Sequence, residues 1–179
     1  LQEAQIPIVY HDEMRDTKGK LRVLSLFSGC GGMDLGFEGM FIANRKSFPQ
    51  DSLYIDHAIN KNWVMLKKTK FKTVFANDIL NEAEVAWTTY MSRFGYQPEM
   101  YHNISIVDLV KMHKQGADIF PKNIEVVTGG FPCQDFSVAG KRKGFNSDKD
   151  DYGKKREGDE PSEETRGKLY YWMKQVIAT

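Results

Sequence analysis

The chain has 179 residues, of which 41% are hydrophobic and 12% aromatic, so it is long enough to bury the core of one domain. Its 25 Lys and Arg residues balance 24 Asp and Glu residues, so a nucleic-acid partner has to be argued from local patches. No run of about 18 apolar residues and no charged-then-apolar leader occurs, so the sequence predicts neither a membrane span nor a secretion signal.

In chain order, residues 1–20 are polar and unpatterned, which is typical of an arm or linker. The apolar run 21–27 is predicted to be a buried parallel strand, and the glycine-rich stretch 28–36 is predicted to be the turn that follows it. The apolar residues within 55–66 recur at helical spacing, which predicts a helix there. A second strand is expected over 72–78.

The next stretch, 79–94, is predicted to be an amphipathic helix. Its apolar face consists of Leu80, Ala83, Trp87, Tyr90, Met91 and Phe94. A third strand over 102–106 precedes a helical stretch ending near Gly116, and a fourth strand covers 124–131. A last helix is predicted within 167–179. Its inward-facing residues are Leu169, Trp172, Met173, Val176 and Ile177.

Strands that alternate with helices predict an α/β fold with a parallel sheet and flanking helices. Ligands of such sheets bind beyond the carboxyl ends of the strands. The stretches after the first, second and fourth strands are therefore expected to line one crevice. Residues 148–166 contain 13 charged side chains among 19 and are predicted to be a solvated flexible loop, which overlaps a predicted flexible insertion over 146–165.

The glycine turn and Asp78 are the first candidate site. Glycines allow a sharp bend and a close approach of backbone amides to a ligand, although an ordinary tight turn explains them equally well. Asp78 ends the second strand, where an acid can bind ribose hydroxyls, but a lone acid there is more often the cap of the next helix. Together the two features favour a ligand that contains adenosine.

The cysteines are the second candidate. Cys30 and Cys133 lie far apart and the four histidines show no metal-ligand spacing with them, so we expect free thiols in a reduced, intracellular protein and no metal. A single cysteine is most often inert packing. Cys133, however, follows the fourth strand on a polar loop beside the expected cofactor site, which favours a nucleophile.

Three stretches, LFSGCGGMDLGFE, FAND and GGFPCQDFSVAGKRKGF, resemble successive motifs of the DNA (cytosine-5)-methyltransferase family, in the family's order. The resemblance covers roughly residues 21–179 and is most specific at the Pro-Cys-Gln sequence. It implies a Rossmann-like S-adenosylmethionine-dependent methyltransferase fold. It also implies a bacterial enzyme of a restriction-modification system, in the cytoplasm or nucleoid, that acts on double-stranded DNA.

The resemblance assigns roles to matching positions. Cys133 would add to C6 of a flipped-out cytosine, so that C5 accepts the methyl group of S-adenosylmethionine and S-adenosylhomocysteine is released. Asn103 stands where the family usually has an aspartate. The implied cofactor-binding residues are Phe27, Ser28, Gly29, Cys30, Gly31, Gly32, Asp78, Ile79, Asn103, Phe131, Pro132 and Leu169. The implied DNA-binding residues, on a mobile loop over 132–147, are Gln134, Ser137, Lys141, Arg142 and Lys143.

A solvated surface loop explains the three basic residues Lys141–Lys143 as well as phosphate contact does. Two segments, 41–71 and 146–165, are longer than the family usually has. Alternative functions are a tRNA cytosine-5 methyltransferase, a catalytically silent subunit that binds cofactor or DNA, and a nucleotide-dependent dehydrogenase. The glycine turn fits the dehydrogenase pattern poorly.

The family's Glu-Asn-Val sequence, its later arginine motif and its target-recognition domain do not occur in residues 1–179. We therefore expect an incomplete enzyme that does not methylate DNA unaided, with its fourth strand left as an exposed edge. Either a complementary second chain supplies the rest, or the chain, which starts at Leu1 rather than Met, is a truncated form or a cleaved fragment.

Overall fold

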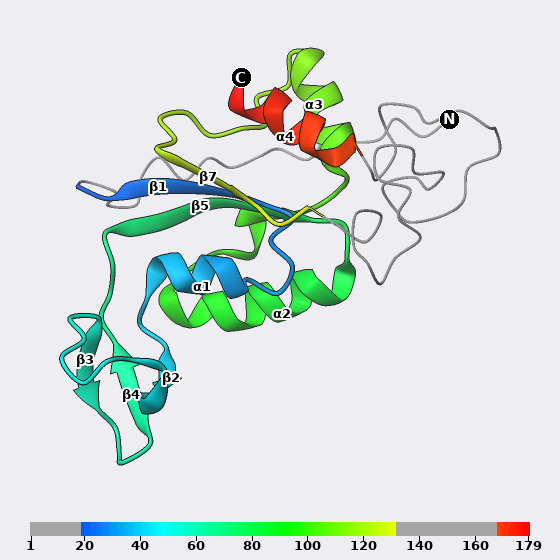
Figure 1. The fold of residues 1–179 in the computed structure, drawn as a ribbon. Coiled ribbons are helices and arrows are strands. Elements are labelled where there is room, and N and C mark those ends of the chain that lie inside the picture. The colour runs from blue at the N-terminus through cyan, green and yellow to red at the C-terminus, as the bar shows by residue number, and fades with distance from the viewer. Residues whose placement is uncertain (1–18, 132–167) are drawn as a thin grey trace.

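The structure, a computed structural model, describes residues 19–131 and 168–179. Its centre is a four-stranded parallel sheet with the strand order β6-β5-β1-β7 (Figure 1). The strands are β1 (Leu21–Leu26), β5 (Phe71–Asp78), β6 (Tyr101–Asn103) and β7 (Val126–Gly129). The α/β class and the parallel sheet are thus confirmed.

β1 is one of the two inner strands of this sheet, which agrees with its apolar sequence and its burial on both faces. Val23, Leu24 and Leu26 are almost completely buried, as a strand with neighbours on both sides and helices on both faces requires. β1 runs in register with β5 from Leu21 opposite Phe71 to Leu26 opposite Asn77, with one shift after Val23. The strands predicted over 21–27 and 72–78 are confirmed to within one residue at each end.

The two outer strands are shorter than the sequence predicted. β6 ends at Asn103 because Ser105 caps the next helix, its Oγ accepting a hydrogen bond of 3.2 Å from the amide of Val107. β7 covers only Val126–Gly129 of the predicted 124–131, and among the described residues it pairs only with β1.

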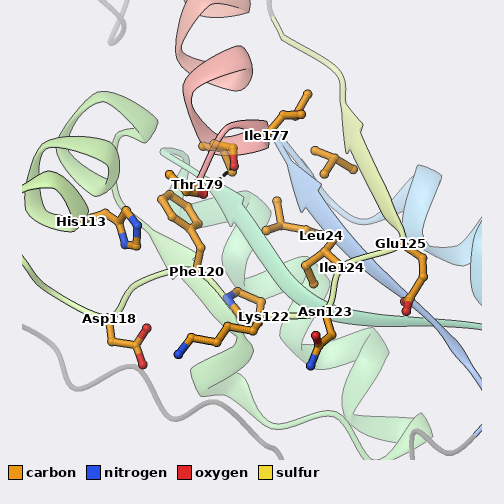
Figure 2. Close-up of a pocket in the computed structure, with 13 residues that line it drawn as sticks. Leu24, His113, Asp118, Phe120, Lys122, Asn123, Ile124, Glu125, Ile177 and Thr179 are labelled. Carbon is orange, nitrogen blue, oxygen red and sulfur yellow. Dashed lines mark hydrogen bonds between the residues drawn. The ribbon is translucent and has the colours of Figure 1, made fainter.

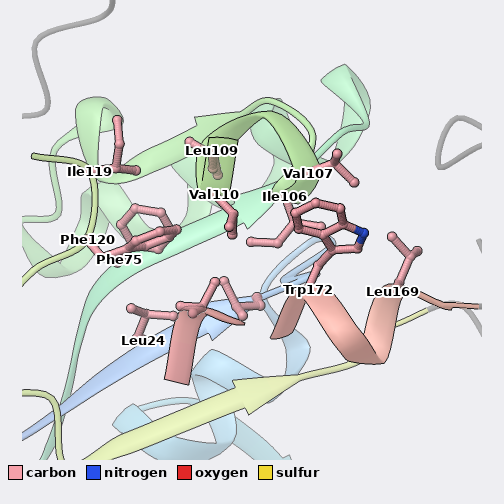
Figure 3. Packing of buried hydrophobic residues seen from close by; sticks show 12 residues of the cluster. Leu24, Phe75, Ile106, Val107, Leu109, Val110, Ile119, Phe120, Leu169 and Trp172 are labelled. Atoms are coloured by element: carbon pink, nitrogen blue, oxygen red, sulfur yellow. The ribbon is translucent and has the colours of Figure 1, made fainter. Parts of the chain in front are cut away.

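Helices cover both faces of this sheet (Figure 1). On one side lie α1 (Gly32–Glu38) and α2 (Asn81–Met91), and on the other lie α3 (Ile106–Lys114) and α4 (Leu169–Ile177). The α3–α4 side forms the larger core cluster, which contains Trp172 and Leu169 of α4 together with Leu24 and Phe75 of the sheet. Within it, Trp172 lies beside Ile106 and Val107 of α3 (Figure 3).

The predicted helix faces are mostly correct. In α2, Ala83, Trp87 and Met91 are buried, whereas Leu80 is 56% exposed because it lies at the N-cap, before the helix turns its face to the sheet. In α4, Leu169, Trp172 and Val176 are buried, but Ile177 is 60% exposed at the end of the helix, so the inward position predicted for Ile177 is wrong.

The helix predicted over 55–66 is wrong. That stretch forms β3 (Ile55–Ala58) and β4 (Trp63–Leu66) of a separate small sheet, in which β4 pairs antiparallel with β3 on one side and with β2 (Ile42–Asn44) on the other (Figure 1). The reason is the turn between them: Oδ1 of Asn60 accepts hydrogen bonds from the amides of Asn62 and Trp63, at 2.9 and 3.1 Å. Side-chain contacts of this kind stabilise a turn instead of a continuous helix.

Among the residues that the structure describes, no helix has the length and apolar character needed to cross a membrane.

Candidate functional site

The candidate site lies where β1 and β5 end side by side. The amide of Ser28 donates to the carbonyl of Asn77 at 2.7 Å, and the amide of Asn77 donates to Oγ of Ser28 at 3.1 Å. One residue further on, the amide of Gly29 donates to Oδ2 of Asp78 at 3.0 Å. The glycine turn and the acid that ends the second strand are therefore in direct contact, as the crevice prediction required.

The turn has a left-handed backbone at three alternate positions: Phe27 with φ 53°, Gly29 with φ 52° and Gly31 with φ 88°. Phe27 is the unusual member, because only glycine adopts this conformation without steric cost. A Cβ placed on Gly29 or Gly32 would meet no atom within 4 Å, so the turn is open at both positions. A ligand can approach the backbone closely there.

Gly31 is needed for a different reason, which is the packing beneath the turn. A Cβ at Gly31 would lie 2.7 Å from Cδ1 of Trp87, a fully buried side chain of α2. The indole Nε1 of Trp87 donates to Oδ2 of Asp34 at 2.6 Å, which ties α2 to α1. Burial raises the pKa of Asp34, with a further contribution from nearby Glu38, and the hydrogen bond from Trp87 opposes the shift.

Both carboxylate oxygens of Asp78 accept hydrogen bonds from backbone amides. Oδ1 accepts from the amides of Ile79 and Leu80, at 2.8 and 3.2 Å, and Oδ2 accepts from Gly29. The N-cap of α2 is Leu80, which makes no side-chain capping bond, so the reading of Asp78 as the helix cap is wrong. A carboxylate has about four acceptor positions, so one remains for a ligand hydroxyl after these three bonds.

The start of β6 supports the turn from the next strand. The hydroxyl of Tyr101 donates to the carbonyl of Gly29 at 3.0 Å. Burial, and then the negative charge of Asp78, raise the pKa of Tyr101, so its hydroxyl stays protonated and remains a donor. Nδ2 of Asn103 donates to the carbonyl of Asp78 at 3.3 Å, which places Asn103 beside the predicted site.

Asn77 joins these strand ends from inside the sheet. Its side chain is buried, and Nδ2 donates to the carbonyls of His102 and Ile104 at 2.9 and 2.7 Å. Sequence reasoning did not assign Asn77, Tyr101 or Trp87 to the site. A polar residue inside the otherwise apolar second strand was the available signal for Asn77, but Tyr101 and Trp87 looked like ordinary core residues.

The end of β7 also contacts the end of β1. The rings of Phe27 and Phe131 meet edge to face, with centroids 6.2 Å apart, and the amide of Gly130 donates to the carbonyl of Leu26 at 3.3 Å. Leu169 of α4 is buried in the core cluster against which Phe27 and Phe131 pack. The three strand ends thus converge as predicted.

The remaining predicted residues divide into two groups. Cys30 is an exposed free thiol in the glycine turn. Pro132, Cys133, Gln134, Ser137 and Lys141–Lys143 lie outside the described residues, so the nucleophile and the DNA contacts stay predictions. Within 19–131 and 168–179, no three His, Cys, Asp or Glu side chains are grouped as metal ligands.

A pocket of about 620 Å³ lies elsewhere, at the amino end of β7 (Figure 2). Ile124, Glu125 and Lys122 line it together with Ile177 and Thr179 at the end of α4. None of the residues assigned to the site from the sequence lines this pocket. The carboxyl ends of the strands, where the assigned residues meet, are therefore the better candidate site.

The parallel sheet, with a glycine turn closed on an acid at the end of the next strand, defines a Rossmann-like methyltransferase fold. The family model described as C-5 cytosine-specific DNA methylase matches residues 21–152, and the chain belongs to this family.

Three relatives illustrate the match. The chain is 35% identical over 126 residues to the Type II methyltransferase M.BsuRI of Bacillus subtilis, covering 69% of the chain and 25% of the relative. It is 33% identical over 140 residues to M.BspRI of Lysinibacillus sphaericus, covering 75% and 28%. It is 27% identical over 173 residues to M1.ScrFI of Lactococcus lactis subsp. cremoris, covering 97% and 29%. The chain thus spans little more than a quarter of the length of these relatives.

Proposed function

We propose that this chain forms the cofactor-binding and nucleophile-bearing part of an enzyme that methylates C5 of cytosine in DNA. The observation that carries the proposal is the contact between the amide of Gly29 and the carboxylate of Asp78. It brings the family's first two motifs together around an open glycine turn. Membership of the cytosine-specific DNA methylase family supports the choice of substrate.

The described residues fit S-adenosylmethionine. The open positions at Gly29 and Gly32 leave room for a ligand against the backbone, and Asp78 has one acceptor position left for a ribose hydroxyl. Phe27, Ser28, Cys30, Gly31, Ile79, Asn103, Phe131, Pro132 and Leu169 are the further proposed cofactor residues. When bound, the cofactor supplies a methyl group on a positively charged sulfur.

The proposed work of Cys133 is to activate the base. Its thiolate forms a bond to C6 of a flipped-out cytosine, and the ring electrons this displaces make C5 nucleophilic. After C5 has gained the methyl group, it loses its proton, the bond between the Cys133 sulfur and C6 breaks, and the ring becomes aromatic again. Gln134, Ser137, Lys141, Arg142 and Lys143 are proposed to contact the DNA.

We also propose that methyl transfer requires motifs that residues 1–179 do not contain, such as Glu-Asn-Val, supplied by a longer or complementary polypeptide. Support comes from the relatives, of which the chain covers 25% and 28%. A glutamate that holds N3 of cytosine makes C6 more easily attacked.

Calorimetry with S-adenosylhomocysteine tests the cofactor site in the chain itself. Asp78→Asn is expected to weaken binding about tenfold, because one charged acceptor is lost. The matched control is Asp108→Asn, an exposed aspartate of α3 on the other side of the sheet, which is expected to bind like wild type. Equal affinity of both variants would remove Asp78 from the site, and binding of NAD instead would contradict the methyltransferase assignment.

Covalent capture tests the reaction in a complete enzyme that contains this stretch. A duplex with 5-fluorocytosine should trap wild type and Cys30→Ala but not Cys133→Ser, because fluorine at C5 prevents release of the cysteine. The same sequence offered as RNA separates DNA from tRNA as substrate. A trapped adduct in Cys133→Ser would refute the nucleophile, and no adduct with either polymer would favour a catalytically silent subunit.

A further inference from the structure

A second, smaller pocket lies at the amino ends of the strands, where α1 ends and β5 begins. It has a volume of about 180 Å³, room for a small group such as a phosphate together with water. Its lining residues are Glu38, Gly39, Met40, Lys68, Lys72, Arg93, Phe94 and Tyr96. Three cations therefore surround a pocket that has a single carboxyl among its lining residues.

Two of the three cationic side chains, those of Lys72 and Arg93, lie over aromatic rings. Nζ of Lys72 lies 3.7 Å from the ring centroid of Tyr96, and Cζ of Arg93 lies 5.4 Å from that of Tyr90. A cation over a ring face is held in place while its charge still acts on a neighbouring anion. The pocket is thus partly organised before a ligand arrives.

The single carboxyl is directed into the protein. Glu38 is buried, and its Oε1 accepts hydrogen bonds from the amide of Thr73, at 2.5 Å, and from the hydroxyl of Tyr96. Burial and then the charge of Glu38 raise the pKa of Tyr96, so this hydroxyl remains a donor to Glu38. An anion entering the pocket meets Lys68, Lys72 and Arg93.

The surface beside the pocket is also basic. Residues 41–70, which form the small sheet and its connections, contain six Lys or Arg residues and two Asp residues, whereas the whole chain has 25 against 24. Lys46 and Lys61 flank the far end of this sheet, where Asn44 pairs with Trp63. This charge opposes packing against a second copy and attracts a polyanion.

The pocket is separate from the cofactor crevice. Lys72 lies near the start of β5 and Asp78 at its end, six residues and about 20 Å apart along an extended strand. The phosphates next to a cytosine bound in the crevice are therefore not the ones that would occupy this pocket.

We propose that the pocket lined by Lys68, Lys72 and Arg93 binds a phosphate group of the DNA backbone, and that the basic small sheet follows the neighbouring phosphates. The DNA bound there is a stretch other than the one that contains the target base. The proposal rests on the proposed function only in taking DNA as the ligand. Inorganic phosphate and pyrophosphate have the same chemistry, so the experiment distinguishes them from DNA.

Fluorescence anisotropy of the full chain with a labelled 24-base-pair duplex of A·T pairs alone tests this site, because such a duplex has no cytosine. Lys68→Gln/Arg93→Gln is expected to weaken binding about tenfold at low salt and to reduce the slope of log K against log salt by about one to two. The control, Lys114→Gln/Lys122→Gln, removes two charges on the α3 side of the molecule. It is expected to change affinity less than twofold.

Calorimetry with S-adenosylhomocysteine accompanies both variants, and unchanged cofactor binding shows that the fold and the crevice are intact. Equal losses in the pocket variant and the control would overturn the proposal, because net charge alone would then explain the binding. So would micromolar binding of pyrophosphate, abolished in the pocket variant, alongside unchanged DNA affinity. A failure of methyl transfer leaves the result unaffected, which keeps this test apart from that of the proposed function.

Discussion

The two sheets of this protein are stabilised in different ways. In the four-stranded sheet, Val23, Leu24 and Phe75 are almost completely buried between helices on both faces. In the small sheet, Val64 and Leu66 are buried on one face, whereas Ile42 and Trp63 remain exposed. The small sheet depends instead on local polar contacts, such as the three backbone carbonyls that receive hydrogen bonds from Arg45.

This difference predicts that the two sheets respond separately to substitutions. The glycine turn is attached to the four-stranded sheet by the two hydrogen bonds between Ser28 and Asn77 and by the bond from the amide of Gly29 to the carboxylate of Asp78, so it shares the rigidity of the main core. The small sheet lies instead near the amino end of β5, where an isolated bridge pairs Gly39, directly after α1, with Lys68, just before β5. Changes in the small sheet should therefore leave the cofactor crevice intact, and the following predictions test this separation.

The largest expected effect comes from comparing one tryptophan in each region. Trp87→Ala should lower the free energy of unfolding by about 3–5 kcal/mol, because it removes a fully buried ring and the partner of Asp34. Trp63→Ala should cost about 1 kcal/mol at most, because this ring is 44% exposed. Urea denaturation measures both. Similar losses would show that the small sheet belongs to the main cooperative unit.

A glycine pair gives the next largest effect. Gly31→Ala should lower the free energy of unfolding by about 1–3 kcal/mol and weaken S-adenosylhomocysteine binding, because the new Cβ would press on Trp87. Gly95→Ala introduces the same left-handed backbone strain, since Gly95 has φ 80°, but its new Cβ would meet no atom within 4 Å. If the two variants were equally destabilised, backbone strain alone would explain the result and Trp87 would not support the turn.

A smaller effect is expected in the pH dependence of stability. The raised pKa of Asp34 means that the folded state binds this proton more tightly than the unfolded state. Its stabilisation is complete below the ordinary aspartate pKa of 3.8 and is lost as the pH rises through the raised pKa. Asp34→Asn should lack this decline while still accepting from Trp87, so its stability relative to wild type should increase with pH.

The matched control lies in the small sheet, where Asp56 pairs with His57 at 2.8 Å and both side chains are more than half exposed. Asp56→Asn should leave the pH profile almost unchanged, because solvent screens such a pair. Thermal unfolding between pH 4 and 8 measures both profiles. A parallel course of the Asp34→Asn and wild-type profiles would exclude Asp34 as the titrating group.

The sequence predicted the crevice well because its parts are local. An apolar run, a glycine turn and an acid at a strand end each have a pattern of their own, and parallel strands bring their carboxyl ends together. The supporting contacts could not be predicted in this way. Asp34 and Trp87 are 53 residues apart, and Tyr101 and Gly29 are 72 apart, so nothing in one sequence pairs them.

In the small sheet, by contrast, the local sequence pattern was misleading. Ile55, Ile59, Trp63 and Leu66 have helical spacing, but Asn60 bends the chain between them. Buried Val64 and Leu66 alternate with the more accessible Trp63 and Met65, as in a strand. Turn chemistry and period-two alternation were the signals that the helical interpretation missed. Cys133 and the basic loop lie outside the described residues, so the sequence remains their only support.

The smallest expected effect is the loss of Arg45, which tests whether the small sheet can loosen alone. Its guanidinium donates to the carbonyls of Phe48, Pro49 and Gln50 at 3.0–3.1 Å. Arg45→Ala should lower the global free energy of unfolding by about 0.5–1 kcal/mol, because these bonds are partly solvated. The amides of Ser52 and Ile55, which bond within this loop, should exchange hydrogen faster, whereas those of β1 should not. Lys46→Ala, next to it, removes one charge without these bonds and should exchange like wild type. Faster exchange in β1 of Arg45→Ala would mean that the two sheets open together, and the small sheet could then not vary independently of the cofactor site.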